Sequence, residues 1–470
     1  MAHTDTQGYT VSTSSSAALA AYEQGANLWI RWRSGAMEAL DSAIADDPQF
    51  ALAHCARAYL GWRMGRGDIV VDAHQQVMAL ADDVHDAREH LHTQVVDAIR
   101  QHDTATTLHR LEELVEASPT DHVATQVLNF AYSARGDKQR ALTQARRSLA
   151  VSPDDPHFLT MTAFYLEQSN TDPDEGLELG LRALAADPGN LYTYHAVGHN
   201  YQGRGDYAQC LATFERANSI ERYPHLLWHL AEAHAILGDP RLTRDYWSST
   251  APALPLFERI ELQWRLEMLR GVPVDRAIWQ DLATQGEQLL EQADYLTIWM
   301  HHWIGLALAR AGDVTKAQQQ VARLRQLPEG RPGGYWSTVG AALLEGEMAL
   351  IRGELATAVQ LMTPAIEHMH DLGGGSREQK DIFMDVYLEL QRRLGDTEAV
   401  IELAQRRLER NPNHFQSLAA LGWAYRHTGQ TSRQHQMYQA LINRAEAAPV
   451  DAGMPALLEA RQALDQEQEA

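Results

Sequence analysis

Cysteine is almost absent from this sequence, since Cys55 and Cys210 are the only two among 470 residues. A disulfide framework is therefore excluded, and the usage fits a reducing compartment. No apolar run approaches the ~18 residues of a membrane span. The opening stretch MAHTDTQGYTVSTSSS also lacks the basic and apolar regions of a signal peptide. We expect a cytoplasmic protein with no membrane partner.

Positive charge is also scarce. Lys and Arg number 40 against 62 Asp and Glu, which leaves a net charge of −22. Nucleic acids and anionic surfaces repel such a chain, so nucleic acid is not expected as a partner. A phosphate-binding glycine loop with its lysine, a CxxC pair and an HExxH motif are absent from the sequence as well.

What the sequence does contain is a repeat. Prolines that follow a small or acidic residue recur at Pro119, Pro153 and Pro188, in steps of 34 and 35 residues. This is the period of tetratricopeptide repeats, in which each unit is a pair of antiparallel helices. The abundance of Ala, Leu, Gln, Glu and Arg also favours helices. The sequence therefore predicts an all-α fold, a tetratricopeptide-type α-solenoid forming a right-handed superhelix of helical hairpins.

Small residues recur in register with this period. When the closing proline is numbered 32, Gly198, Gly305 and Gly422 fall at position 8, while Gly205 and Gly429 fall at position 15. A small residue at position 8 lets the two helices of a hairpin approach closely. Glycine at position 15 ends the first helix, where a left-handed backbone is needed.

The register divides the chain into three parts. We expect residues 1–14 to be a disordered N-terminal tail and residues 446–470 a C-terminal helix and acidic tail. Between them, residues 15–445 are expected to form one continuous solenoid. It should be irregular at about 240–295, where Pro252, Pro255 and Pro273 break the register.

The first helix of each hairpin lines the concave surface of such a superhelix. The register assigns histidine, glutamate and tryptophan to this surface: Glu89, His92, Glu167, His195, His199, His225, Trp228 and His302. His195 and His199 are four residues apart and share one helix face. That spacing suits two ligands of one divalent metal, or a general base next to a hydrogen-bonding partner. It equally suits two groove residues that contact solvent or a ligand and have no catalytic role.

Structural interpretations stand beside these functional ones. Glu167 would equally suit a salt bridge to an arginine, and His229 and His234 fit core histidines. Trp228 and the other tryptophans at helical spacing fit packing positions. Cys55 and Cys210 fall at packing positions of the hairpins, so neither is expected to be a nucleophile.

Five segments carry a more specific resemblance: AREHLH from residue 87, TAFYLEQ from 162, HAVGH from 195, LWHLAEAH from 227 and GGGSREQKDIF from 373. In this order the chain resembles the tetratricopeptide-repeat protein 38-like family over about residues 45–385. The resemblance implies a helical solenoid with a polar pocket and names no reaction. That family usually has histidine where this chain has Arg377, which adds a candidate anion contact.

Two functions remain open on this evidence. The first is binding of a small molecule or a peptide in the concave groove, and its candidate residues are Arg88, Glu89, His92, His225, Trp228, His229, His302 and Arg377. The second is an enzyme with acid–base or metal-assisted hydrolase or lyase chemistry, using Glu167, His195 and His199, in which His195 and His199 would bind a divalent metal.

Overall fold

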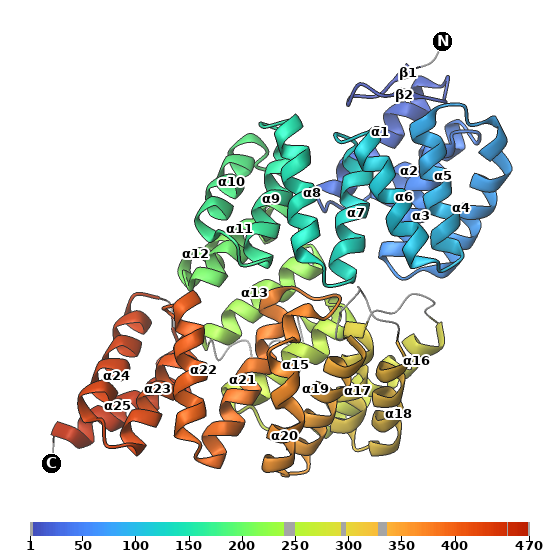
Figure 1. Cartoon of the computed structure of the whole chain (residues 1–470). Coiled ribbons are helices and arrows are strands. Elements are labelled where there is room, and N and C mark those ends of the chain that lie inside the picture. Colours follow the sequence, from blue (N-terminus) through green and yellow to red (C-terminus); the bar gives the residue numbers. More distant parts are fainter. Residues whose placement is uncertain (1–2, 239–249, 293–297, 328–335, 449, 469–470) are drawn as a thin grey trace. The chain divides into compact units, whose positions relative to one another are not determined.

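The computed structural model describes residues 3–238, 250–292, 298–327, 336–448 and 450–468 (Figure 1). These residues form helical hairpins, together with one two-stranded antiparallel pair, β1 (His3–Thr4) and β2 (Thr10–Val11). The prediction of an all-α, tetratricopeptide-type helical-repeat fold is confirmed. The chain forms two compact units: unit 1 is Met1–Ala196 with Leu290–Leu296, and unit 2 is Val197–Leu289 with Thr297–Ala470.

Unit 1 consists of helices that pack in consecutive pairs, α1 with α2 through α9 with α10. Its helices are α1 (Ser16–Ile30), α2 (Ala36–Asp46), α3 (Ala51–Arg63), α4 (Gly67–Leu80), η1 (Ala81–Asp83), α5 (Ala87–Arg100), α6 (Thr104–Ala117), α7 (His122–Ala134), α8 (Lys138–Val151), α9 (Pro156–Gln168) and α10 (Pro173–Ala186). Aspartates cap several of them, and Asp155 precedes Pro156, a residue suited to the first helical position.

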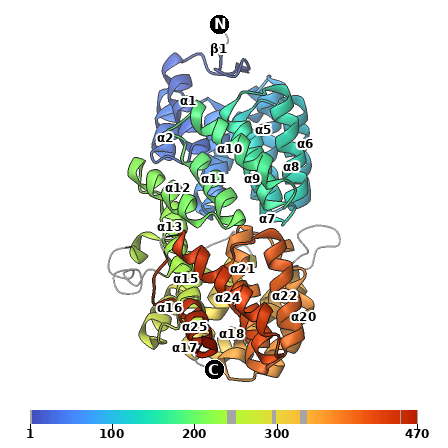
Figure 2. The same ribbon diagram turned by 90° about the vertical axis from the view of Figure 1, so that its left-hand side faces the viewer.

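Helix α11 (Leu191–Arg204) begins in unit 1 and continues into unit 2. The remaining helices of unit 2 are α12 (Tyr207–Ile220), α13 (Pro224–Leu237), η2 (Ala251–Ala253), α15 (Leu256–Arg270), α16 (Arg276–Gln292), α17 (Ile298–Ala311), α18 (Val314–Gln326), α19 (Trp336–Ile351), α20 (Leu355–Ile366), η3 (Met369–Asp371), α21 (Arg377–Leu394), α22 (Thr397–Arg410), α23 (Phe415–His427), α24 (Thr431–Glu446) and α25 (Pro455–Gln468). Helix α25 packs on both α23 and α24, and Figure 2 shows it next to α24. Helix α15 contacts α13, α17 and α21, so it joins early and late parts of this unit.

The stretch at about 240–295, predicted to be irregular, lies partly outside the described residues, at 239–249 and 293–297. Its described remainder holds η2, α15 and α16.

The two helices of a hairpin approach each other closely at position 8 of the repeat, as predicted. A Cβ atom built on Gly198 would overlap the ring of Phe214, and one on Gly422 would overlap the ring of Tyr438. In both cases the aromatic ring belongs to the second helix of the same hairpin. The glycines at position 15 also behave as expected, with φ of 74° at Gly205 and 69° at Gly429.

This packing gives a direct stability prediction. We expect Gly422→Ala to lower the free energy of unfolding by about 1–3 kcal/mol, because the added methyl group displaces the Tyr438 ring. Urea denaturation measures the change. The control is Gly453→Ala, whose added Cβ meets only the Asp451 side chain at 3.3 Å. Equal stabilities of the two variants would contradict a steric role for Gly422.

The expectation of a disordered tail over residues 1–14 is corrected for residues 3–14. They form the β1–β2 hairpin, in which Val11 is 1% exposed and Asp5 is buried. Asp5 Oδ2 lies 3.1 Å from Arg88 Nη2, and the Tyr9 ring centroid lies 4.6 Å from the Arg88 guanidinium. The segment is polar and rich in Ser and Thr. Its order therefore comes from contacts with residues far along the chain, and the local sequence pattern does not predict such contacts.

Candidate functional site

On α5, the predicted ligand-binding residues contact the protein's own N-terminal segment. Arg88 pairs with Asp5 and also with Asp121, whose Oδ2 lies 2.9 Å from Arg88 Nη1. Glu89 Oε1 accepts a hydrogen bond from the Ser12 amide at 2.8 Å. Burial raises the pKa of Glu89. These groove positions are thus occupied by residues 3–14 rather than open.

His92 belongs to the same buried set. Its Nε2 lies 3.1 Å from Asp121 Oδ2, and its Nδ1 lies 3.0 Å from the Tyr59 hydroxyl. Burial alone would raise the pKa of Asp121. The hydrogen bond and charge of His92, together with Arg88, nevertheless hold that pKa well below its usual range. His92 therefore positions a structural carboxylate.

His157, at the start of α9, is a buried histidine that the sequence reading missed. It is 3% exposed, and neither of its ring nitrogens has a hydrogen-bond partner among the described residues. Burial, aided by the charge of neighbouring His122, lowers the pKa of His157 to about 3. The ring is consequently neutral in the folded unit at neutral pH.

The neutral ring predicts acid sensitivity. An unfolded histidine titrates near pH 6.5, so between about pH 6.5 and 3 the unfolded chain binds a proton that the folded unit does not. Stability then falls as the pH falls, by up to about 1.4 kcal/mol per pH unit. We expect His157→Phe to reduce the loss of stability between about pH 7 and about pH 5 in urea titrations. His109→Phe, at an exposed position on α6, serves as the control, and equal pH dependence in both variants would contradict the prediction.

His195 and His199, predicted as a pair, lie one turn apart on α11 but have different neighbours. The His195 ring packs against Trp32 at 4.5 Å and Phe164 at 5.1 Å between centroids. His199 Nδ1 lies 2.6 Å from Glu378 Oε2, a carboxylate at the start of α21. In unit 1, Glu167 is 2% exposed, and its Oε2 accepts a hydrogen bond from Gln168 at 2.7 Å.

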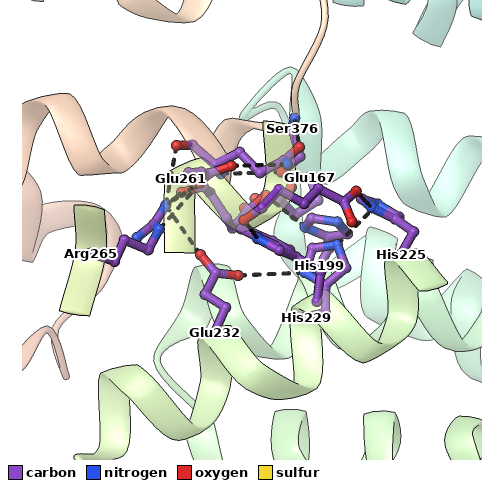
Figure 3. A network of polar contacts seen from close by, with 12 residues as sticks. Glu167, His199, His225, His229, Glu232, Glu261, Arg265 and Ser376 are labelled. Carbon is purple, nitrogen blue, oxygen red and sulfur yellow. Dashed lines mark hydrogen bonds and ion pairs between the residues drawn. The ribbon is translucent and has the colours of Figure 1, made fainter. Parts of the chain in front are cut away.

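A second pair of histidines, on α13 of unit 2, faces one another directly (Figure 3). His225, His229 and Glu232 are spaced i, i+4 and i+7, so they share one helix face. The Nε2 atoms of His225 and His229 are 3.3 Å apart, with ring centroids separated by 4.7 Å. His229 is fully buried, whereas the side chain of His225 is 23% exposed.

Each of these rings directs its other nitrogen at a glutamate. His225 Nδ1 lies 2.5 Å from Glu258 Oε1 on α15, and His229 Nδ1 lies 3.5 Å from Glu232 Oε2. The first contact is a short charge-assisted hydrogen bond, and the second is longer than a good one. Trp228 is buried and donates from Nε1 to the Glu258 carbonyl oxygen at 3.1 Å, which fixes α15 beside α13.

Arg265 on α15 joins this cluster to α21. Its Nη2 lies 3.2 Å from Glu232 and 3.1 Å from Glu261, and it donates to the carbonyl oxygens of Glu378 at 2.6 Å and Gln379 at 3.1 Å. Gln379 in turn donates to Glu261 at 3.2 Å. All of these side chains are buried, so the network excludes water around them.

Carboxyl groups are numerous in this cluster. Four glutamates, Glu232, Glu258, Glu261 and Glu378, are buried in it. Arg265 pairs with Glu232 and Glu261, whereas Glu258 lies against His225 and Glu378 against His199. Arg410 is farther from them, at 3.8 Å from Glu378. Burial raises the pKa of Glu232 and raises that of Glu261 well above its usual value, because the charged forms lose their hydration. Burial also holds the pKa of His229 well below its usual value, which keeps that imidazole neutral.

Other predicted residues lie elsewhere in unit 2. His302 is buried with its Nε2 2.9 Å from Glu347 Oε2, and its ring packs edge-to-face on Phe383. Arg377 is half-buried and begins α21, directly after Ser376, which forms a capping box with Gln379. Both cysteines are buried and burial raises their pKa, in agreement with a structural role.

The sequence reading missed the carboxylate and arginine members of the cluster. Glu232 lies in the noted LWHLAEAH segment, three residues after His229, and this spacing was a usable signal. Glu258, Glu261 and Arg265 lie on α15, in the stretch where prolines break the repeat register. Their relation to α13 depends on packing between helices, so no local motif marks it.

No family model matches the chain. Among solved structures, the chain is similar to a human IFIT1 dimer with PPP-AAAA at 15% identity and a TM-score of 0.42, covering 84% of this chain and 90% of that one. It is also similar to a tetratricopeptide repeat protein from Parabacteroides merdae at 13% identity and a TM-score of 0.31, covering 64% and 98%. MamA of MSR-1 matches 36% of this chain and 96% of its own, at 16% identity and a TM-score of 0.26.

At these identities the similarity concerns the helical-repeat fold alone. The resemblance to the tetratricopeptide-repeat protein 38-like family stays a prediction from the sequence. Among the described residues, no helix has the length and apolar character needed to cross a membrane.

Proposed function

We propose that this helical-repeat protein binds a divalent transition-metal ion between His225 and His229 of unit 2. The observation that carries the proposal is the 3.3 Å separation of their Nε2 atoms. Two nitrogens bound to one tetrahedral zinc at ~2.0–2.1 Å stand about 3.3–3.4 Å apart, so the two imidazoles already have the spacing of a ligand pair.

The partners of the Nδ1 atoms support the same conclusion. A metal-binding histidine usually donates its second ring N–H to a carboxylate or a carbonyl, which fixes the tautomer and leaves the other nitrogen for the metal. Glu258 occupies that place beside His225, and Glu232 lies near the corresponding nitrogen of His229. Neutral imidazole is the form that binds a metal, and burial favours it at His229.

A hydrogen bond between the two rings would also give a 3.3 Å separation. Such a bond needs no metal ion. The two arrangements are told apart by composition, because only a metal site takes up zinc or cobalt(II) in stoichiometric amount.

The test is a metal titration of the purified, chelator-treated chain. We expect zinc to bind with a stoichiometry of about one ion per chain, and cobalt(II) in its place to give the visible absorption of a tetrahedral site with nitrogen ligands. A chain that binds neither ion, or binds them only as weakly as its exposed carboxylates do, would rule the proposal out.

A metal-assisted enzyme is the second candidate, and the exposure of His225 favours it. His225 is 23% exposed beside fully buried His229, which gives water or a small substrate a route to the ion. A bound metal would lower the pKa of its water and polarise a carbonyl group of the substrate. Ester hydrolysis that is lost on chelation and restored by zinc would support this candidate. If a small ligand binds and no reaction follows, the metal-binding proposal stands and the enzyme is rejected.

A further inference from the structure

Unit 1 contains a pocket remote in sequence from α13. Its volume is about 460 Å³, within the ~300–1,000 Å³ range of small-molecule sites. Helix α1 forms one wall of the pocket, and the start of α7 forms another. The turn between α8 and α9, with Ser152 and Asp155, and residues 5–7 of the N-terminal hairpin complete its lining. Its lining includes the apolar side chains of Ala26, Ile30 and Val123.

Most charged groups of the pocket are already paired. Asp5 pairs with Arg88 at 3.1 Å, and Asp155 Oδ2 lies 2.8 Å from His122 Nε2. Glu23 is different. Its Oε1 accepts a hydrogen bond from the Thr6 amide at 2.6 Å, but no cationic side chain among the described residues pairs with its carboxylate.

Tyr22, next to Glu23 on α1, supplies a second polar group of the pocket. The residue is 5% exposed and lines the pocket, and its ring packs edge-to-face on Phe50 at 5.3 Å. No described residue forms a hydrogen bond with its hydroxyl. The hydroxyl is therefore available to form a hydrogen bond with water or a ligand in the pocket.

We infer that this pocket binds a small molecule in which a protonated amine is joined to an apolar portion. The ammonium group would pair with Glu23 and the Tyr22 hydroxyl would accept a second hydrogen bond from it, while Ile30 and Val123 contact the apolar portion. The net charge of −22 draws cations toward the chain and repels anionic analogues.

The experiment compares 4-phenylbutylamine with its neutral analogue 4-phenylbutanol, by calorimetry or ligand-observed NMR on the full chain. We expect the amine to bind at least about 10-fold more tightly, the factor that one charge-assisted hydrogen bond supplies. Glu23→Gln should remove this preference, and Tyr22→Phe should weaken amine binding several-fold. The matched control is Glu38→Gln, at an exposed position on α2.

The Glu23→Gln chain should fold normally, since the amide oxygen still accepts the bond from Thr6. No binding of the amine, equal binding of amine and alcohol, or an unchanged preference in Glu23→Gln would overturn the inference. The result is independent of the metal proposal, because the pocket and the His225–His229 pair belong to different units and are read out by different ligands.

Discussion

Replacing His225 and His229 together by alanine is expected to abolish metal binding, from about one ion per chain to none. The two Nε2 atoms are the groups that would bind the ion, and an alanine side chain has no atom that can take their place as a ligand. Elemental analysis after equilibrium dialysis measures the loss. The control is the double variant His427→Ala/His435→Ala, which removes two exposed histidines of the same unit. Stoichiometric metal in the His225/His229 variant would contradict the assignment.

Single variants separate loss of a ligand from loss of fold. His229 stacks on Phe214 at 5.0 Å, so its removal also leaves a cavity, whereas His225 is partly exposed and its removal disturbs less packing. His225→Ala alone should therefore weaken metal binding with little change in melting temperature. Glu258→Gln, which alters only the partner of His225 Nδ1, should weaken binding by about 10–100-fold.

Arg265→Met is expected to lower the free energy of unfolding by about 3–5 kcal/mol, the cost of leaving a buried charge network without its cation. Arg265 is 2% exposed, pairs with Glu232 and Glu261, and binds two carbonyl oxygens of α21. Denaturant titration measures the change. Arg216→Met, at an exposed position on α12, should change stability by less than about 0.5 kcal/mol. A loss as small as that of the control would contradict the role of Arg265.

The pH dependence of this variant has a definite sign. Burial already raises the pKa of Glu232 and Glu261, and removal of Arg265 takes away the charge that opposes this rise. A carboxyl group with a raised folded pKa stabilises the fold below its unfolded pKa, and the stabilisation is lost as the pH rises through the folded pKa. The deficit of Arg265→Met relative to the native chain should therefore be larger at about pH 8 than at about pH 5.

Local patterns predicted the repeats because the repeats are local. The hairpins α7–α8, α11–α12 and α23–α24 follow the expected register, and the close approaches at Gly198 and Gly422 follow from position 8. Each of these features depends on residues within about one repeat of one another. Order in residues 3–14 was missed because it rests on Arg88, Glu89 and Thr120, which are far along the chain.

In the candidate site too, the sequence predicted features set by nearby residues and missed contacts between residues far apart along the chain. The spacing of His195 and His199 placed them on one helix face, yet His199 contacts Glu378, which lies on a helix far along the chain. His229 fitted a core histidine by its register, and it is indeed buried, but its contact with His225 depends on both side-chain rotamers. Residues of α15 complete the cluster through helix packing. The position of a residue within the repeat predicts the helix face on which it lies, but it does not predict which residues of other helices contact it.

The most direct measurement is X-ray absorption at the zinc edge on the chain loaded with one equivalent of zinc. We predict nitrogen ligands at ~2.0–2.1 Å with the outer-shell scattering of two or more imidazoles, reduced in His225→Ala. A spectrum with only oxygen ligands, or one unchanged in His225→Ala, would contradict a metal ion held by the α13 histidines.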